Sequence, residues 1–187
     1  MMEITTPLTE EMTTGLSAGT QVRLSGQIYT ARDAAHLRLM EMLKAGQEPP
    51  FPFAGQVVFY AGPCPARPGA VCGPIGPTTS GRLDAYSPFF IERGLKYMIG
   101  KGARSSEVAE AVTRHKGLYF AAIGGAAALM SRCVTSMELI AFEDLGPEAI
   151  RLLTVKDLPL VVALDAQGRD IYQRRPAGPT PPFSLTL

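Results

Sequence analysis

Hydrophobic and polar positions divide most of the chain into short strands and helices that alternate. Residues 21–29 carry an apolar side chain at every second position, which is typical of a strand. The next segment, as far as residue 45, repeats apolar side chains at helical spacing, and Thr30 and Asp33 match a capping box at its start. The same patterns predict helices over 10–16, 88–93 and 106–116, and strands over 56–61, 95–99, 118–123, 134–142, 158–164 and 170–173. This alternation predicts an α/β fold.

Composition limits the classes of protein that remain open. With 187 residues and no evident linker, we expect one domain over residues 1–187, with an irregular proline-rich tail at 174–187. A net charge of +1 excludes bulk attraction to nucleic acid or to an anionic membrane. The longest uncharged run, residues 117–131, falls short of the roughly 20 residues of a membrane span. The N-terminus lacks a secretory pattern, so we expect a cytoplasmic protein.

Two glycine-rich loops carry the chemistry that suggests a ligand. Residues 76–84 (GPTTSGRLD) combine backbone donors, hydroxyls and the forked guanidinium of Arg82, and residues 100–105 (GKGARS) repeat this mixture after a predicted strand. Ligands commonly bind where strands end and helices begin in α/β folds, so the loops predict a site for an anionic small molecule. A phosphate-binding loop is the weaker reading, because residues 100–105 lack the GxxxxGK[ST] spacing.

Arg32 and His36 lie four residues apart on one face of the predicted helix. Arg32 is at the N-terminus of that helix, where the dipole favours an anion, but a solvated or ion-paired arginine explains the pattern equally well. We interpret His36 as a structural, hydrogen-bonded histidine rather than a catalyst. The small residues at 124–129 (GGAAAL) allow close approach of another backbone, either within the core or at a partner.

Cysteine usage indicates neither a disulfide framework nor a metal site. Cys64, Cys72 and Cys133 are odd in number, contain no CxxC pair and are accompanied by two histidines only. We interpret all three as ordinary thiols and expect no metal site in the chain.

Five motifs together resemble the β-subunit or C-terminal domain of the class I, iron–sulfur-dependent fumarase and L(+)-tartrate dehydratase family. They occur in order at 29–36 (YTARDAAH), 62–63 (GP), 76–84 (GPTTSGRLD), 98–104 (MIGKGAR) and 124–129 (GGAAAL). The resemblance covers about residues 5–173 and implies a swivelling β/β/α domain. It also implies a hydro-lyase that interconverts a 2-hydroxy dicarboxylate and its dehydrated product. In that family three cysteines of an α-subunit hold a [4Fe-4S] cluster, so we expect the cluster on a partner, in an α2β2 heterotetramer.

The resemblance also implies roles for individual residues. The family's substrate-binding residues fall on Arg32, Thr78, Arg82 and Lys101 of this sequence, with Thr78 as the family's proposed base and Arg32 beside it in catalysis. Asp33 and His36 are expected to orient Arg32. Cationic clamping suits a dianion that is withdrawn from water. A non-catalytic dicarboxylate-binding or regulatory module of the same fold is the alternative, and the motifs leave open which dicarboxylate is used.

Overall fold

Parallel strands form the centre of the fold, and one long antiparallel strand closes them into a barrel-like sheet. The computed structural model describes residues 1–122 and 125–173. The sheet order is β1-β2-β3-β4-β5-β7-β6, and an additional pairing of β2 with β7 closes the ring. The strands are β1 (Met2–Thr5), β2 (Gln21–Thr30), β3 (Val57–Phe59), β4 (Tyr97–Gly100), β5 (Leu118–Ala121), β6 (Val134–Ala141) and β7 (Ile150–Leu164).

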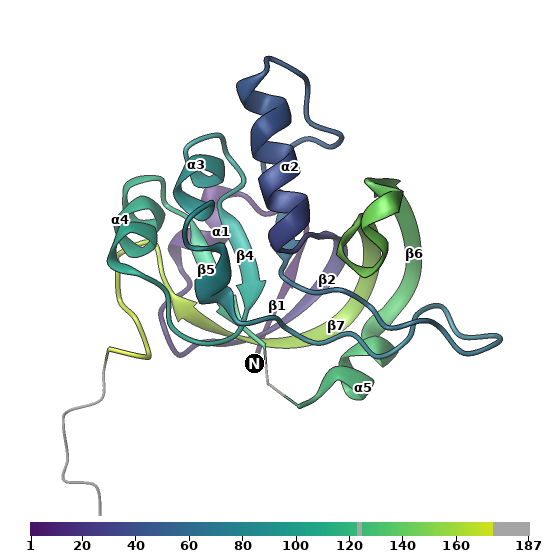
Figure 1. Cartoon of the computed structure of the whole chain (residues 1–187). Coiled ribbons are helices and arrows are strands. Elements are labelled where there is room, and N and C mark those ends of the chain that lie inside the picture. The colour runs from purple at the N-terminus through teal and green to yellow at the C-terminus, as the bar shows by residue number, and fades with distance from the viewer. Residues whose placement is uncertain (123–124, 174–187) are drawn as a thin grey trace, which may run out of the picture.

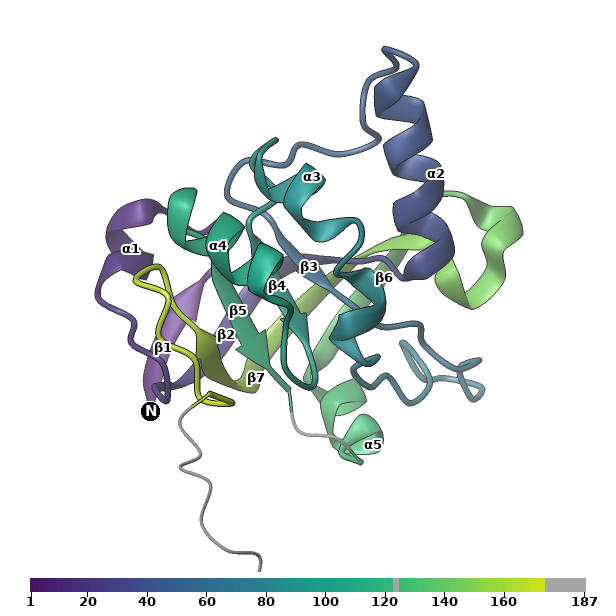
Figure 2. The ribbon, with the colours of Figure 1, turned by 60° about the vertical axis from the view of Figure 1, so that its left-hand side comes forward.

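Helices cover the outside of this curved sheet. Figure 1 shows α2, α3 and α4 on one side and α5 on another, and Figure 2 shows the same arrangement after rotation. No helix in the described parts of the chain is long and apolar enough to cross a membrane. The helices are α1 (Glu10–Thr14), α2 (Asp33–Lys44), α3 (Ser87–Ile91), α4 (Ser106–Arg114) and α5 (Ala127–Met130), with 3-10 turns η1 (Ser80–Leu83), η2 (Ser131–Cys133) and η3 (Glu143–Glu148).

The central strands are buried on both faces. In β3, Val57 and Phe59 belong to the core inside the barrel, whereas Val58 and the following Tyr60 belong to the core beneath the helices. Each such side chain contributes about 1.5–3 kcal/mol by burial, so both faces favour apolar residues. This double burial explains why the sequence shows an unbroken apolar run here instead of alternation.

Most predicted elements are confirmed, with bounds that differ from the predicted ones by a few residues. Thr9 caps α1 by accepting a hydrogen bond from the Met12 N–H at 3.3 Å, and Ser105 caps α4 by accepting one from the Val108 N–H at 3.4 Å. The predicted turn at residues 165–168 is present, with Gly168 at a φ of 79°. The irregular tail predicted at 174–187 lies outside the described residues. So do residue 123, at the end of a predicted strand, and residue 124, at the start of the small-residue segment.

The capping box at Thr30 and Asp33 is wrong. Thr30 is the last residue of β2, and its hydroxyl accepts a hydrogen bond from the Arg151 N–H of β7 at 3.2 Å. The N-cap of α2 is Arg32, without a side-chain cap of its own. The carboxylate of Glu148, distant in the sequence, accepts from the Ala34 N–H at 2.9 Å instead. Sheet pairing therefore removed Thr30 from the role that local spacing gave it.

Three further predictions need correction. Ser87 does not cap α3, because it is the first helical residue and its hydroxyl donates to the Leu83 carbonyl at 2.8 Å. The strand predicted over 158–164 begins eight residues earlier, at Ile150. The polar residues Arg151, Thr154 and Lys156 obscure the strand pattern in this part of the sequence. Residues 170–173 form a turn with one isolated bridge, Asp170 to Leu164, rather than a strand.

A buried guanidinium fixes the two glycine-rich loops to each other. The Arg104 side chain is 1% exposed, and its Nε donates to Asp84 Oδ1 at 2.7 Å while its Nη2 donates to Ser87 Oγ at 2.7 Å. The other Asp84 oxygen accepts from the Ser105 N–H at 2.7 Å. A second link runs from Ser80 through the Tyr119 hydroxyl, at 2.9 Å, to the Gly102 carbonyl at 2.9 Å. The two loops are thus held together by polar contacts that are buried or partly buried.

His36 fixes the start of α2. Its ring is 1% exposed and lies edge-on to Tyr60 and Phe90. Nδ1–H donates to the Arg32 carbonyl at 2.9 Å, since a carbonyl can only accept. Burial lowers the pKa of His36 to about 4, although the hydrogen bond to the Arg32 carbonyl opposes this shift; the positive charge of Arg104 lowers the pKa by a smaller amount than that bond raises it. His36 is therefore neutral at pH 7, as a structural histidine should be.

Replacing Arg104 by Met should destabilise the fold by about 3–5 kcal/mol, because Asp84 keeps its charge and loses its partner. Chemical denaturation measures this loss. The double variant Arg104→Met, Asp84→Leu should recover part of it, and Arg114→Met, at an exposed position, should change stability by less than about 0.5 kcal/mol. A single Arg104→Met variant within about 1 kcal/mol of wild type would contradict this role.

Acid should weaken the fold through His36. An unfolded imidazole binds a proton below pH 6.5, whereas the folded one resists until about pH 4. The stabilisation is therefore complete above pH 6.5 and is lost as pH falls toward 4, by about 3 kcal/mol in total. Unfolding free energies measured from pH 7 to pH 4.5 should fall steeply for wild type and less steeply for His36→Gln. Equal slopes for the two proteins would contradict the assignment.

Candidate functional site

The candidate site lies where three parallel strands end side by side. Strands β2, β3 and β4 are paired in parallel, so their carboxyl ends meet at one edge of the sheet. Arg32 follows β2, the segment 60–62 follows β3, and Lys101 follows β4. The glycine-rich loop that contains Thr78 and Arg82 crosses these strand ends. The fold therefore gathers the sequence-predicted residues at one edge of the sheet.

Thr78 lies between the ends of β3 and β4. Its N–H donates to the Tyr60 carbonyl at 2.6 Å, and the neighbouring Pro77 forms a bridge with Ala61. On the other side, Thr79 forms a bridge with Lys101, whose carbonyl accepts from the Ser80 N–H at 2.9 Å. The half-buried Thr78 hydroxyl makes no hydrogen bond to any residue that the structure describes. Its backbone is fixed while its hydroxyl stays available.

A glycine lets this loop approach β4 closely. A Cβ added at Gly100 would collide with the Ser80 hydroxyl and would lie 3.1 Å from the Tyr60 ring. Gly100 therefore has no room for a side chain, which is a steric reason for glycine at the end of this strand. The Ser80 hydroxyl uses this space to reach Tyr119, and burial raises the Tyr119 pKa well above its ordinary value, so that the phenol stays protonated.

Arg32 is half-buried beside two carboxylates. Its Nη2 lies 3.4 Å from Glu148 Oε1 and 3.7 Å from Asp33 Oδ2. Its aliphatic stem passes Gly62, where a Cβ would lie 3.3 Å from Arg32 Cδ. Tyr60 and Ala61, which contact Thr78 and Pro77, directly precede Gly62. Arg32 and Thr78 therefore both contact the short segment 60–62. Arg32 is thus ion-paired, as one of the two interpretations predicted, and it also lies next to the candidate site.

Arg82 and Lys101 differ from Arg32 in their surroundings. Both side chains are exposed, Arg82 on η1 and Lys101 just beyond β4. Within the described ranges, 1–122 and 125–173, no carboxylate lies within ion-pair distance of either cation. Two uncompensated cations at one edge of the sheet attract anions, as a dicarboxylate site requires.

The other residues divide into orienting and structural groups. Asp33 and His36 both contact Arg32, the first through its guanidinium and the second through its carbonyl. Arg104, part of the second cationic loop, is buried in the loop network and is not available to a ligand. Sequence reasoning missed Glu148, which no local pattern connects with Arg32 because the two are far apart in the chain.

The cysteines do not fit an iron–sulfur cluster. Cys64 is exposed, Cys72 is buried in the barrel core and Cys133 is intermediate, and all three are free thiols. Burial raises the pKa of Cys72 and, together with Asp157, that of Cys133, which disfavours the thiolate that a metal requires. Among the described residues, no three His, Cys, Asp or Glu side chains are placed to hold a metal ion.

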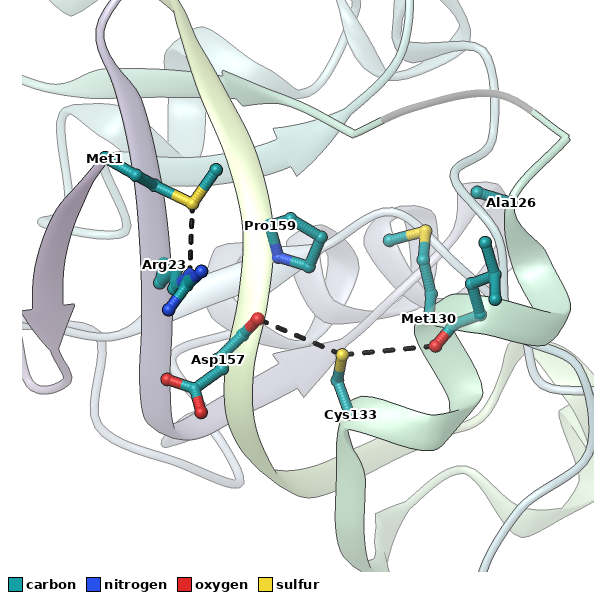
Figure 3. Close-up of a pocket in the computed structure, with 8 residues that line it drawn as sticks. Met1, Arg23, Ala126, Met130, Cys133, Asp157 and Pro159 are labelled. Carbon is teal, nitrogen blue, oxygen red and sulfur yellow. Dashed lines mark hydrogen bonds between the residues drawn. The ribbon is translucent and has the colours of Figure 1, made fainter.

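A well-formed cavity lies elsewhere on the molecule. It measures about 490 Å³ and is lined by the start of β2, the middle of β7 and the α5–η2 segment (Figure 3). Arg23 donates to the Met1 sulfur at 3.2 Å at one side, and the Cys133 thiol lies 4.0 Å from the Asp157 carbonyl at the other. None of the predicted site residues lines this cavity, so it is distinct from the candidate site.

Comparison with known proteins identifies a family and several relatives of this chain. The family model described as Fumarase C-terminus matches residues 1–175. A putative L(+)-tartrate dehydratase subunit beta from Methanocaldococcus jannaschii is 38% identical over 172 residues, which is 89% of this chain and 88% of that protein. The anaerobic class I fumarate hydratase of Escherichia coli is 37% identical over 157 residues, 83% of this chain and 29% of that enzyme.

Fumarate hydratase 2 of Leishmania major is also 37% identical, over 83% of this chain and 28% of its own length. The chain thus spans less than a third of the fumarate hydratases that it matches, but nearly the whole of the tartrate dehydratase subunit. The family model covers every described residue, including both loops and the strand ends that they cross. On these grounds, the chain belongs to the Fumarase C-terminus family.

Proposed function

We propose that this chain is the β-type half of an iron–sulfur-dependent hydro-lyase that interconverts a 2-hydroxy dicarboxylate and its dehydrated product. The reaction is of the fumarate hydratase or L(+)-tartrate dehydratase type. The observation that carries the proposal is a pair of exposed, uncompensated cations: Arg82 on the same loop as Thr78, and Lys101 at the strand end that bridges to this loop. The names of the relatives support the reaction class.

Each cation has a distinct role in this proposal. Arg82 offers a planar fork of donors that can bind one carboxylate in a bidentate manner, and Lys101 offers a compact charge for the same dianion. Dehydration also removes a proton from the carbon beside a carboxylate. Cations that bind this carboxylate stabilise the negative charge that develops on it as the proton leaves.

Thr78 is the proposed base, and Arg32 is its proposed partner. A free threonine hydroxyl is a poor base at pH 7, so the neighbourhood must favour its deprotonated form. Arg32 reaches the same segment, residues 60–62, that supports Thr78. Asp33 and His36 orient Arg32 through the contacts described above.

The proposal includes a partner. The side chains of Arg82 and Lys101 are exposed, so another chain must cover them to exclude water from the reaction. In this proposal an α-subunit supplies that cover and holds the [4Fe-4S] cluster, in an α2β2 heterotetramer, and the fold is the swivelling β/β/α domain. The β-subunit name of the methanogen relative supports a separate partner chain.

The test is anaerobic co-expression with an α-like chain encoded beside this one, followed by cluster reconstitution and assays with malate, fumarate and L(+)-tartrate. Turnover should require both chains. Arg82→Ala and Lys101→Ala should each lower kcat/KM by at least about a hundredfold, because each removes a charge that the transition state uses. Light scattering of the complex checks the heterotetramer.

Arg114→Ala is the matched control, since Arg114 is exposed at the C-terminal end of α4, away from the strand ends. Its activity should stay within about twofold of wild type. A loaded complex that binds dicarboxylates without turning them over would favour the regulatory module. Full activity in Arg82→Ala and Lys101→Ala would contradict the proposed site.

A further inference from the structure

The Glu148 side chain connects the start of α2 with the guanidinium of Arg32. One carboxylate oxygen, Oε2, accepts from the Ala34 N–H at 2.9 Å, and the other, Oε1, lies 3.4 Å from Arg32 Nη2. A carboxylate at this place is stabilised by the free N–H groups of the helix and by its dipole. Glu148 therefore has a fixed position relative to the helix and, through it, relative to Arg32.

The segment that carries Glu148 is itself held firmly. Arg151 donates to the Gly146 carbonyl at 2.8 Å, and Ala149 and Ile150 are fully buried directly after Glu148. The Pro147 carbonyl packs so closely against Gly62 that a Cβ there would collide with it, and Arg32 Cδ would lie 3.3 Å from the same Cβ. η3 thus holds Glu148 beside Arg32, although η3 belongs to neither glycine-rich loop.

Charge divides the three site cations into two kinds. Arg32 faces the carboxylates of both Glu148 and Asp33, whereas no acid of the described chain pairs with Arg82 or Lys101. Arg32 consequently adds little net positive charge to the site. A dianionic substrate is attracted mainly by the two uncompensated cations.

The remaining donors of Arg32 point to a specific use. Nη2 is occupied by the carboxylates, while Nε is buried and lacks a hydrogen-bond acceptor in the described structure. A buried donor without an acceptor is unfavourable, so Arg32 keeps one donor available for an acceptor other than Glu148 and Asp33.

We propose that Glu148 is a positioning residue. It fixes the orientation of Arg32 and cancels its charge, so that substrate carboxylates go to Arg82 and Lys101 while Arg32 stays beside Thr78. The kinetic effect of this inference rests on the proposed function. The Glu148–Arg32 contact does not, because both residues are in this chain.

The first test is Glu148→Gln in the reconstituted complex. The Gln oxygen can still accept from the Ala34 N–H, so α2 keeps its cap and the midpoint of chemical denaturation should stay at the wild-type value. Losing the negative charge frees Arg32 to turn toward a substrate carboxylate. We expect kcat to fall by about tenfold to a hundredfold through misplacement, and KM to fall several-fold because the site becomes more positive.

Glu143→Gln is the matched control, since Glu143 is exposed on the same 3-10 turn and should leave both constants unchanged. A purely structural Glu148 would leave kcat unchanged in Glu148→Gln, because the cap acceptor is retained. An unchanged kcat or an increased KM in Glu148→Gln would overturn the inference. The proposed function would still stand if wild type turns over the substrate.

A second readout needs no activity. In ¹⁵N NMR spectra of the isolated chain, the Arg32 Nε–H signal, identified by its loss in Arg32→Lys, should shift in Glu148→Gln and stay in place in Glu143→Gln. If wild type turns over no dicarboxylate, the proposed function fails. The Arg32 Nε–H signal then remains as the test of whether Glu148 orients Arg32. A signal that is identical in all three Arg32-containing chains would overturn the positioning role.

Discussion

The buried ion pair between Arg104 and Asp84 is the constraint on which the rest of the site depends. Its donors bind the end of one glycine-rich loop, the start of α3 and, through Asp84, the N-terminus of α4. A charge this deeply buried is tolerated only with its partners in place, so the two loops are fixed together. The half-buried Thr78, on the loop that ends at Asp84, and the exposed Lys101, on the loop that contains Arg104, are held in position by this ion pair.

Similar residue types acquire different roles from their surroundings. Arg104 is buried and structural, Arg32 is compensated by Glu148 and Asp33, and Arg82 is exposed without an acid partner among the described residues. The difference lies in burial and in the carboxylates within reach of each guanidinium, of which Glu148 comes from a distant segment. Only Arg82 and Lys101 therefore present a net charge to a ligand, and the cationic character of the loops overstates the positive charge at the site.

Local patterns predicted those parts of the fold that local physics decides. Alternation located β2, and the caps at Thr9 and Ser105 located two helix starts. Thr30 and Ser87 were misread because pairing with β7 and contact with Leu83 and Arg104 outcompeted capping. The motifs indicated Arg32, Thr78, Arg82 and Lys101, but no spacing could reveal Glu148, which reaches Arg32 only through the tertiary fold.

The central claim is that Arg82 and Lys101 together bind the carboxylates of one substrate beside Thr78. The most direct measurement is a crystal structure of the reconstituted complex with L-malate bound. The account predicts malate oxygens within about 3 Å of the Arg82 guanidinium and of Lys101 Nζ, with Arg32 still facing Glu148. A malate molecule that contacts neither cation, or that binds Arg32 after its release from Glu148, would contradict it.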